Sequence, residues 1–434
     1  MVEWLSVNQL SGSGITIISV TASANTLSTS RTTSIVVSGL TTSVVVPITQ
    51  EYIQTTLSVN PNTFTFQSSG GTSTFEVYSP YDWYSSGVTS DCSISPVSGS
   101  SGTTTVTLSV SANTAYEKQF SFDIYNEHQS ETVHVSQDAA SSSGSVTDYL
   151  TFEIISGGHI HWIKGRRFNA NAGTIQYSIN NGPWSSVTPT TSGTGYMCSV
   201  SAGDVVRFKG DNSCYSQYPG YDYSYAACFC GTTATFNVRG NINSLIDSTG
   251  FSAMTTLSSA YTFQFLFHYC NVISAYDLVL PNTSLTECCY DHLFSNCTGL
   301  TLPPRLTAET LGIYCYNSMF YNCGALESTQ PSLPATALTE GCYYSMFRGC
   351  TGLRESPLLP ADTLVDYSYY GMFSGCTQLS AITALATSVT ASNCTNNWVR
   401  NVSSAGTFTK ATTMSGWSTG NNGIPSGWTV VDAT

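Results

Sequence analysis

Few residues in this sequence have the types and spacing that chemistry at an active site requires. The segment Gly416-Trp417-Ser418-Thr419-Gly420 has the spacing of the nucleophile elbow of serine hydrolases, which needs a strand before it and a helix after it. It lies in a glycine-rich tail, so we interpret it as a loop. His159 and His161 fall on one face of a predicted strand and could hold a metal ion, but no third ligand accompanies them. We therefore predict no enzyme, no metal site and no cofactor.

Cysteines are the other chemically active residues, and the chain has 15 of them. The pairs Cys228 and Cys230, and Cys288 and Cys289, have no histidine at a spacing that suits zinc. Five further cysteines recur at a regular period, at positions 270, 297, 323, 350 and 376. Such recurrence predicts small, buried, unpaired thiols that fill one column of a repetitive fold.

Tyrosines form two groups that could bind a ligand through their rings. The first group is broken by Pro219 and Gly220, which predicts a loop, and it comprises Tyr215, Tyr218, Tyr221, Tyr223 and Tyr225. The second is a column at the repeat period, comprising Tyr290, Tyr316, Tyr343 and Tyr369, with Tyr344 and Tyr370 as a partial second column. Rings on a weakly charged surface suit the apolar faces of sugars. Packing inside the protein is the alternative interpretation of both groups.

The composition limits the class of protein that carries these residues. The 434 residues include 13 basic and 26 acidic side chains, a formal net charge of −13 and a charged fraction of 9%, against about 25% in an average globular domain. No stripe of lysine or arginine could neutralise phosphates, so we expect no nucleic-acid partner. No apolar stretch is long enough to span a membrane, and the first residues lack the features of a secretory signal.

A repeat of 26 or 27 residues organises the C-terminal part of the chain. The segment Leu293-Phe294-Ser295-Asn296-Cys297 returns, with Met in the first position, at residues 319–323, 346–350 and 372–376. Apolar residues four and eight positions apart, such as Leu285, Cys289 and Leu293, predict a short helix in each repeat. A period of this length is typical of a solenoid.

The string Leu333-Pro334-Ala335-Thr336-Ala337-Leu338, followed by residues 342–353, resembles the BspA-type leucine-rich repeats, and the resemblance covers about residues 257–380. It implies an α/β solenoid of the kind found in surface proteins of gut Bacteroidetes and in virion proteins of their phages, including crAss-like phages. The tail with Trp398, Trp417 and Trp428 resembles the terminal cap of such arrays.

The first 139 residues alternate apolar and polar positions in short segments, which predicts β-strands. Ser23-Ala24-Asn25-Thr26 recurs as Ser111-Ala112-Asn113-Thr114, and Gln50 and Gln137 close the two copies. These residues resemble the BACON family of Ig-like modules, which implies a β-sandwich and a role as a spacer or in carbohydrate binding. Residues 1–52 look like the C-terminal half of such a module, and we predict that another chain completes it or that it anchors the protein.

We therefore predict a multidomain, mainly β protein with Ig-like β-sandwich modules, a middle β-sandwich and a C-terminal α/β leucine-rich-repeat solenoid with a cap. The predicted parts are a partial BACON-like module (1–52), a BACON-like module (53–139), a Ser/Gly linker (140–147), a β-sandwich (148–245), BspA-type repeats (246–395) and a C-terminal cap (396–434).

The predicted function is that of a phage virion fibre or decoration protein that displays its repeats for adhesion to host-surface or mucus glycans. Other virion proteins would bind its N-terminal modules, and we expect a homo-oligomer on the virion. A secreted BspA-like adhesin on a bacterial surface is the alternative, and an accessory region of a carbohydrate-active enzyme is a third possibility.

Overall fold

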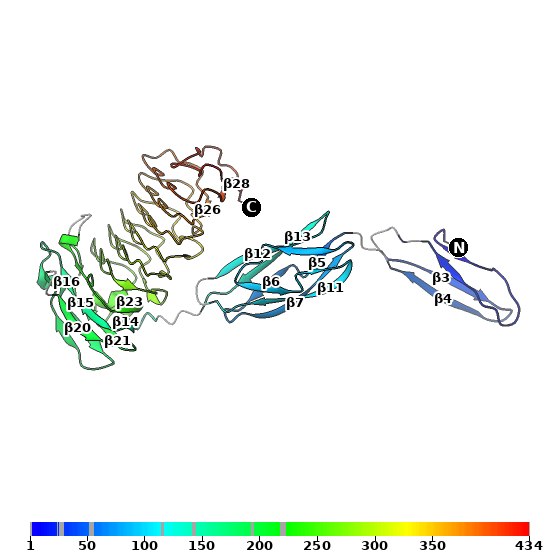
Figure 1. The fold of residues 1–434 in the computed structure, drawn as a ribbon, viewed down its shortest axis with the longest axis horizontal. Helices are drawn as coiled ribbons and strands as arrows, with labels where there is room; N and C mark the ends of the chain where they lie inside the picture. Colours follow the sequence, from blue (N-terminus) through cyan, green and yellow to red (C-terminus); the bar gives the residue numbers. More distant parts are fainter. Residues whose placement is uncertain are drawn as a thin grey trace. The chain divides into compact units, whose positions relative to one another are not determined.

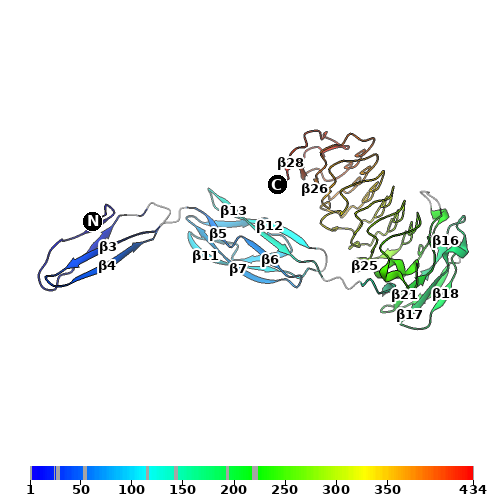
Figure 2. The ribbon, with the colours of Figure 1, turned by 180° about the vertical axis from the view of Figure 1, so that it is seen from behind.

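The computed structural model describes residues 2–23, 25, 30–51, 56–113, 117–140, 145–191, 195–217 and 223–433. The described chain is mainly β and forms several sheets, in one compact unit that ends near residue 138 and a second that starts near residue 139 (Figure 1, Figure 2). Its helices are short 3-10 segments: η1 (Ala170–Gly173), η2 (Tyr223–Tyr225), η3 (Ile242–Leu245) and η4 (Phe251–Ala253). Within the described residues, no helix has the length and apolar character needed to cross a membrane.

Residues 2–51 form two pairs of antiparallel strands. Strand β1 (Leu5–Val7) pairs with β2 (Val20–Ala22), and β3 (Arg31–Ser38) pairs with β4 (Ser43–Gln50). Runs of Val, Ile and Thr favour the extended backbone of the second pair. The guanidinium of Arg31 lies 4.5 Å from the centre of the Trp4 ring and donates a hydrogen bond of 3.0 Å to Oε1 of Gln50. The hairpin and the chain before it are therefore joined at one end by a polar cluster.

Residues 57–137 form a sandwich of two sheets with its own core, which we call the two-sheet sandwich. The first sheet has the order β5 (Ser58–Asn60), β7 (Gly71–Ser79), β11 (Gly102–Val110) and β9 (Cys92–Ser95). The second has the order β10 (Ser98–Gly99), β8 (Trp83–Ser86), β12 (Lys118–Tyr125), β13 (Ser130–Gln137) and β6 (Thr63–Phe66). Alternate residues such as Phe75 on β7 and Phe122 on β12 are buried between the sheets, as period-two patterning requires. This is the β-sandwich that the sequence predicts.

The second unit begins with a seven-stranded sheet. Its strands are β18 (Ser185–Val187), β17 (Ile175–Ile179), β21 (Val205–Gly210), β14 (Leu150–Ser156), β23 (Thr235–Asn241), β24 (Asn271–Val272) and β25 (Leu278–Val279), the last pairing with β23. Two smaller sheets join β15 (Gly158–His161) to β20 (Tyr196–Val200), and β16 (Ile163–Lys164) to β19 (Thr190–Thr191) and β22 (Ala227–Cys228).

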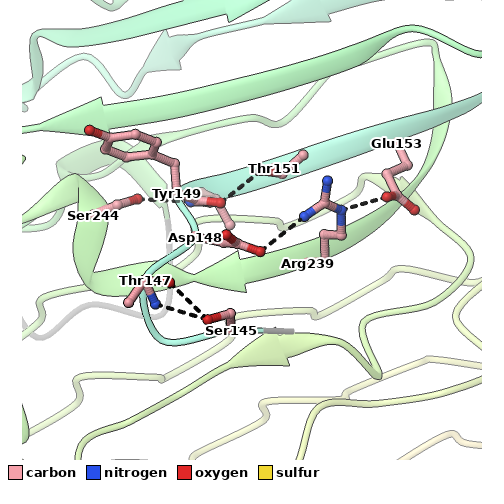
Figure 3. A network of polar contacts seen from close by, with 9 residues as sticks. Ser145, Thr147, Asp148, Tyr149, Thr151, Glu153, Arg239 and Ser244 are labelled. Atoms are coloured by element: carbon pink, nitrogen blue, oxygen red, sulfur yellow. Dashed lines mark hydrogen bonds and ion pairs between the residues drawn. The ribbon is translucent and has the colours of Figure 1, made fainter. Parts of the chain in front are cut away.

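Polar contacts hold the beginning of this sheet in place (Figure 3). Arg239 on β23 lies between Asp148 and Glu153 and forms ion pairs with both, at 3.4 and 2.5 Å. The hydroxyl of Ser244 accepts a hydrogen bond of 2.9 Å from the backbone N–H of Leu150. The first strand of the unit, β14, is thus tied to β23 by side chains as well as by the backbone.

From about residue 257 the chain winds into stacked turns, each bonded to the next through its backbone (Figure 1). The N–H groups of Tyr290, His292 and Phe294 donate to carbonyls of the following turn, at Cys315, Asn317 and Met319. The N–H groups between them, such as that of Leu293, bond three residues back within their own turn. Along residues 288–297, every second backbone N–H group therefore bonds to the neighbouring turn. In an α-helix these groups would bond four residues back within the same helix.

The predicted helix in each repeat is consequently wrong. The backbone φ is positive at Cys288, His292 and Asn296, every fourth residue, and it repeats at the corresponding positions of the next turns. Left-handed residues at that interval interrupt any right-handed helix. The spacing of four that links Leu285, Cys289 and Leu293 is real, but it is the period of successive tight turns. Among the described residues the predicted α/β character is thus replaced by strands and turns.

The seven-stranded sheet and the stacked turns share one hydrophobic core, which runs from Leu150 to Trp428. Strand β23 pairs in parallel with β24 and β25, so the sheet continues directly into the turns. The boundary that we predict at residue 245 is therefore not a boundary between two cores.

At the C-terminal end of this core, β26 (Ala381–Ala384), β27 (Thr407–Lys410) and β28 (Thr429–Asp432) form a parallel sheet. The rings of Trp398 and Trp417 stack there with centroids 5.3 Å apart. Phe408 packs against both rings. Large aromatic side chains thus close the last turns of the core.

Candidate functional site

The tyrosine column of the repeats lies inside the protein. Tyr290, Tyr316, Tyr343 and Tyr369 are buried, and their rings follow one another at centroid distances of 5.8, 5.8 and 6.1 Å. They are one ladder of the core, next to a ladder of phenylalanines that includes Phe294 and Phe320. Our prediction that this column binds a ligand is wrong, because buried rings present no face to the solvent.

The predicted tyrosine loop does not form a shared surface in the described residues. Tyr215 is buried, and its hydroxyl donates a hydrogen bond of 2.6 Å to the carbonyl of Leu245. Burial raises the pKa of this phenol far above its usual value. Tyr225 is half-buried beneath the guanidinium of Arg167. Tyr218, Tyr221 and the side chain of Tyr223 lie outside what the structure describes.

A different aromatic group is half-exposed on the stacked turns. The rings of Tyr344 and Tyr370 stack with centroids 4.5 Å apart and an interplanar angle of 6°. Tyr314 and Tyr367 flank Tyr344 at 6.1 and 6.4 Å. This group, the turn tyrosines, corresponds to the partial second column of the sequence. The two stacked rings cover each other's faces, so less aromatic surface is left for a ligand.

The other chemical candidates do not assemble into a site. The rings of His159 and His161 lie 6.4 Å apart, and burial, with repulsion from His159, lowers the pKa of His161. No group of three or more His, Cys, Asp or Glu side chains suited to a metal ion occurs within the described ranges. The segment 416–420 has no helix after it, so it lacks the geometry of a nucleophile elbow.

The recurring cysteines are buried free thiols. The thiols at 297, 323, 350 and 376 each donate to a backbone carbonyl of the preceding turn, with Sγ to oxygen distances of 3.0 to 3.2 Å. Burial raises the pKa of Cys297, and that of Cys376, to about 12. These side chains are structural, because a protonated and buried thiol neither attacks a substrate nor binds a metal.

Two clefts lie on the two-sheet sandwich, at residues that the sequence does not single out as a site. One cleft has a cavity volume of about 580 Å³ and is lined by Pro80, Tyr81, Asp82, Tyr84, Ser101, Tyr125, Asn126 and Glu127. A neighbouring hollow of about 450 Å³ shares Tyr125 and Asn126 and adds Ser86, Asp123, His128, Gln129 and Ser130. We call the two together the tyrosine cleft.

The pairing of β8 with β12 determines the positions of the two central rings of the tyrosine cleft. Tyr84 on β8 stands directly opposite Tyr125 on β12, and the ring centroids are 6.0 Å apart. Their neighbours Trp83 and Ile124 point inward and are fully buried, so the alternation of the strands turns both tyrosines outward. Tyr84 is 50% exposed and Tyr125 is 38% exposed. The sheet therefore presents a pair of tyrosine rings to the solvent.

A buried hydrogen bond positions the loops that border these rings. Nδ2 of Asn126 donates to Oγ of Ser79 at 3.1 Å, which joins the end of β7 to the turn between β12 and β13. Oδ1 of Asn126 accepts from the backbone N–H groups of His128 and Gln129, at 2.9 and 2.8 Å. The ring of Tyr81 then packs edge-on against that of His128, with centroids 4.8 Å apart. The cleft is thus formed before any ligand arrives.

The polar groups of the tyrosine cleft favour a neutral ligand. Asp82, Glu127 and Asp123 supply carboxylate oxygens, and the lining includes no lysine or arginine. Carboxylates accept hydrogen bonds from hydroxyl groups and repel anions. Two outward tyrosine rings next to such acceptors can bind a ring that has one apolar face and a rim of hydroxyls.

Sequence reasoning missed this site because its tyrosines are not periodic. The sequence does contain a local indication of the site. In Trp83-Tyr84 and in Ile124-Tyr125 an apolar residue precedes a tyrosine, and neighbouring residues of a strand point to opposite faces of the sheet, so one residue of each dipeptide faces the solvent. That Tyr84 and Tyr125 face each other depends on the register of β8 against β12, which no motif in the sequence specifies.

Comparisons with known proteins bear on the N-terminal part. The model of the BACON family, described as "Putative binding domain, N-terminal", matches residues 2–51. No curated protein matches the chain.

Three solved structures are similar to parts of the chain. A Bacteroides ovatus GH5 xyloglucanase in complex with a XXXG heptasaccharide shares 23% identity over 27% of this chain and 24% of its own, with a TM-score of 0.19. The YadV chaperone shares 11% identity over 42% of this chain and 98% of its own, and the periplasmic chaperone SfaE shares 12% over 41% and 98%, each with a TM-score of 0.17. The chain thus spans about a quarter of the length of the xyloglucanase. None of these similarities is close enough to assign a function.

Proposed function

We propose that this protein binds carbohydrate and that the tyrosine cleft of the two-sheet sandwich is its glycan site. The observation that carries the proposal is the outward, cross-strand pair Tyr84 and Tyr125 beside carboxylate acceptors. The match of residues 2–51 to the BACON family supports it, because that family suggests a module associated with carbohydrate.

The ligand class follows from the chemistry of the cleft. A pyranose has one face of C–H groups, which the ring of Tyr84 or Tyr125 can cover. Its equatorial hydroxyls can donate hydrogen bonds to the carboxylates of Asp82 and Glu127. Sulfated or uronic sugars would meet carboxylates without a compensating lysine or arginine in the lining. The ligand is therefore a neutral glycan, bound without covalent change to either partner.

The setting that we propose is adhesion at a surface. The protein is a fibre or decoration protein of a phage virion that attaches to host-surface or mucus glycans, and a bacterial surface adhesin is the second candidate. The resemblance of residues 257–380 to BspA-type leucine-rich repeats supports both settings. In either of them the stacked turns, with their continuous core, form a stiff element of the chain.

A glycan array probed with the full chain tests the ligand class. We expect binding to neutral oligosaccharides, and weaker or no binding to sulfated and uronic ones. Binding confined to anionic glycans, or no binding to any glycan at millimolar concentration, would overturn the proposal.

A further inference from the structure

The two hollows of the tyrosine cleft are joined by shared residues and by contacts between their linings. Tyr125 and Asn126 line both hollows, so the ring of Tyr125 borders each of them. The ring of Tyr81, from the first hollow, packs against that of His128, from the second. Oε1 of Glu127, also from the first hollow, lies 3.3 Å from Nε2 of His128. The hollows are therefore adjacent parts of one cleft.

The outward residues of β8 and β12 form two rows across the sheet. Tyr84 stands opposite Tyr125 in the first row, and Ser86 stands opposite Asp123 in the second. Both residues of the first row line the first hollow, and both residues of the second row line the second. Successive outward residues of a strand lie about 6.8 Å apart, because each residue advances the strand by about 3.4 Å. This separation is comparable to the size of one sugar ring, so each row can hold one sugar unit.

The two hollows differ in chemistry. Three tyrosine rings line the first hollow, those of Tyr81, Tyr84 and Tyr125. The second hollow has Tyr125 as its one tyrosine, and its lining is otherwise polar, with Asp123 and Ser130 among its residues. A sugar in the first hollow is therefore held mainly by its apolar face, and a sugar in the second mainly by its hydroxyls.

The carboxylate of Asp123 is held in position before a ligand binds. The neighbouring side chains of Phe122 and Ile124 are buried in the core, so the alternation of the strand turns Asp123 outward. Oγ1 of Thr132, on β13, donates a hydrogen bond of 2.7 Å to Oδ1 of Asp123. A carboxylate has about four acceptor sites, so this bond leaves others for the hydroxyls of a ligand. A side chain that is already fixed loses less entropy when the ligand binds.

We propose that the tyrosine cleft binds a chain of at least two sugar units, one in each hollow, and that Asp123 selects for the second unit. The inference rests on the proposed function, because it specifies which neutral glycans the same site takes. The ring of Tyr125 contacts both units, Tyr84 covers the apolar face of the first, and Asp123 accepts hydrogen bonds from the second. A single sugar fills one hollow and makes only part of these contacts. The protein therefore prefers oligosaccharides to monosaccharides.

The test is calorimetric titration of the full chain with neutral oligosaccharides of one linkage, from the monosaccharide to the tetrasaccharide, in the series that binds best on the glycan array. We expect the Kd to fall at least tenfold from the monosaccharide to the trisaccharide. Asp123→Ala should weaken binding of the trisaccharide at least tenfold, because a hydrogen bond to a charged acceptor is lost, and should leave the monosaccharide unaffected. The matched control is Glu76→Ala, which removes an exposed carboxylate of β7 that lines neither hollow, and it binds like the unmodified chain.

A second measurement uses the unmodified chain and covers the case in which Asp123→Ala disturbs β12. In NMR spectra the monosaccharide should shift the backbone amide signals of residues 81–84, and the trisaccharide should also shift those of residues 128–130. Three results would each overturn the inference and leave the proposed glycan site standing: equal affinity for the monosaccharide and the trisaccharide, undiminished binding of the trisaccharide by Asp123→Ala, or no shift at residues 128–130 with any bound oligosaccharide. Absence of binding at every chain length would overturn the proposed function, and this inference with it.

Discussion

At the scale of single residues, two buried tyrosines of the same ladder differ in one hydrogen bond. The hydroxyl of Tyr290 accepts a bond of 2.9 Å from Nδ2 of Asn282, whereas the hydroxyl of Tyr343 has no hydrogen-bond partner in the part of the chain that the structure describes. A buried polar atom without a partner costs free energy, and removing one partner of a buried pair costs more than removing an unpaired group.

We expect Tyr290→Phe to lower the free energy of unfolding by about 1 kcal/mol, because it deprives the buried Asn282 of an acceptor. The matched change is Tyr343→Phe, at a tyrosine of the same ladder two turns further along the chain. It should leave the free energy of unfolding unchanged or raise it. Urea unfolding followed by circular dichroism measures both. Equal losses in the two variants would show that the hydrogen bond is not what distinguishes them.

His268 makes the stability of the stacked turns depend on pH. Burial, and then repulsion from His292, lower the pKa of His268 to about 4, while Nδ1 lies 2.5 Å from Oγ of Ser295. A histidine of the unfolded chain has a pKa of about 6.5. Between about pH 6.5 and pH 4 this side chain is therefore protonated in the unfolded chain and neutral in the folded chain. We expect the stability to fall as the pH drops from about 6.5 to about 4, and His268→Asn to flatten that part of the curve. An unchanged slope in the variant would remove His268 as the cause.

The tyrosines also show what the sequence can and cannot tell about single residues. The period identified the column at 290, 316, 343 and 369, and the structure places these rings in register. The direction of the column was missed, because residues recur at the same interval whether they face the core or the solvent. The burial of these rings in the folded chain settles it.

At the scale of elements, the turns depend on residues with a left-handed backbone. Ser318, Ser345 and Gly371 occupy the same position in successive turns, with φ of 50°, 49° and 59°. Glycine adopts this conformation without strain, and serine does not. The hydroxyl of Ser345 is also buried without a hydrogen-bond partner in the described part of the chain.

We expect Ser345→Gly to stabilise the protein by about 1 kcal/mol, because it relieves the left-handed strain and removes the buried hydroxyl. The converse change, Gly371→Ala, should destabilise it by at least as much, since a Cβ there would lie 3.0 Å from Oγ of Ser345 and φ is positive. Thermal unfolding of the two variants measures the difference. A loss of stability in Ser345→Gly would contradict this account of the turns.

Element type was harder to predict than element position. The repeat period located each turn correctly, but Leu285, Cys289 and Leu293 at spacings of four suit both an α-helix and a run of four-residue turns. The two structures differ in the acceptors of their backbone N–H groups. The N–H groups of Tyr290 and Phe294 donate to carbonyls of the next turn. In the first unit the alternation of strands is unambiguous, and there the predicted sandwich is present.

At the scale of the whole molecule, the two units differ in what they need to fold. The two-sheet sandwich has a core of its own, from Leu57 to Val135. The seven-stranded sheet and the stacked turns share a single core, and β23 needs β24 and β25 as its parallel neighbours. The sequence showed a change of pattern near residue 245 but could not show that the core continues across it.

We therefore expect a chain cut after residue 245 to lose the seven-stranded sheet as well as the turns, while the two-sheet sandwich stays folded. Hydrogen exchange, read separately for residues 150–241 and 58–137, checks this. Full protection of residues 150–241 in the shortened chain would show that the sheet is an independent domain.

The central claim is that a neutral glycan binds at Tyr84 and Tyr125, and the most direct test is retardation of the full chain in a native gel that contains the neutral polysaccharide selected on the array. The unmodified chain should be retarded, and Tyr84→Ala combined with Tyr125→Ala should weaken binding at least tenfold, since both exposed rings are lost. The control Tyr269→Ala, an exposed tyrosine of the stacked turns, should be retarded like the unmodified chain. Undiminished retardation of the double variant would contradict the claim. Loss of retardation in Tyr344→Ala with Tyr370→Ala instead would place the site on the turn tyrosines.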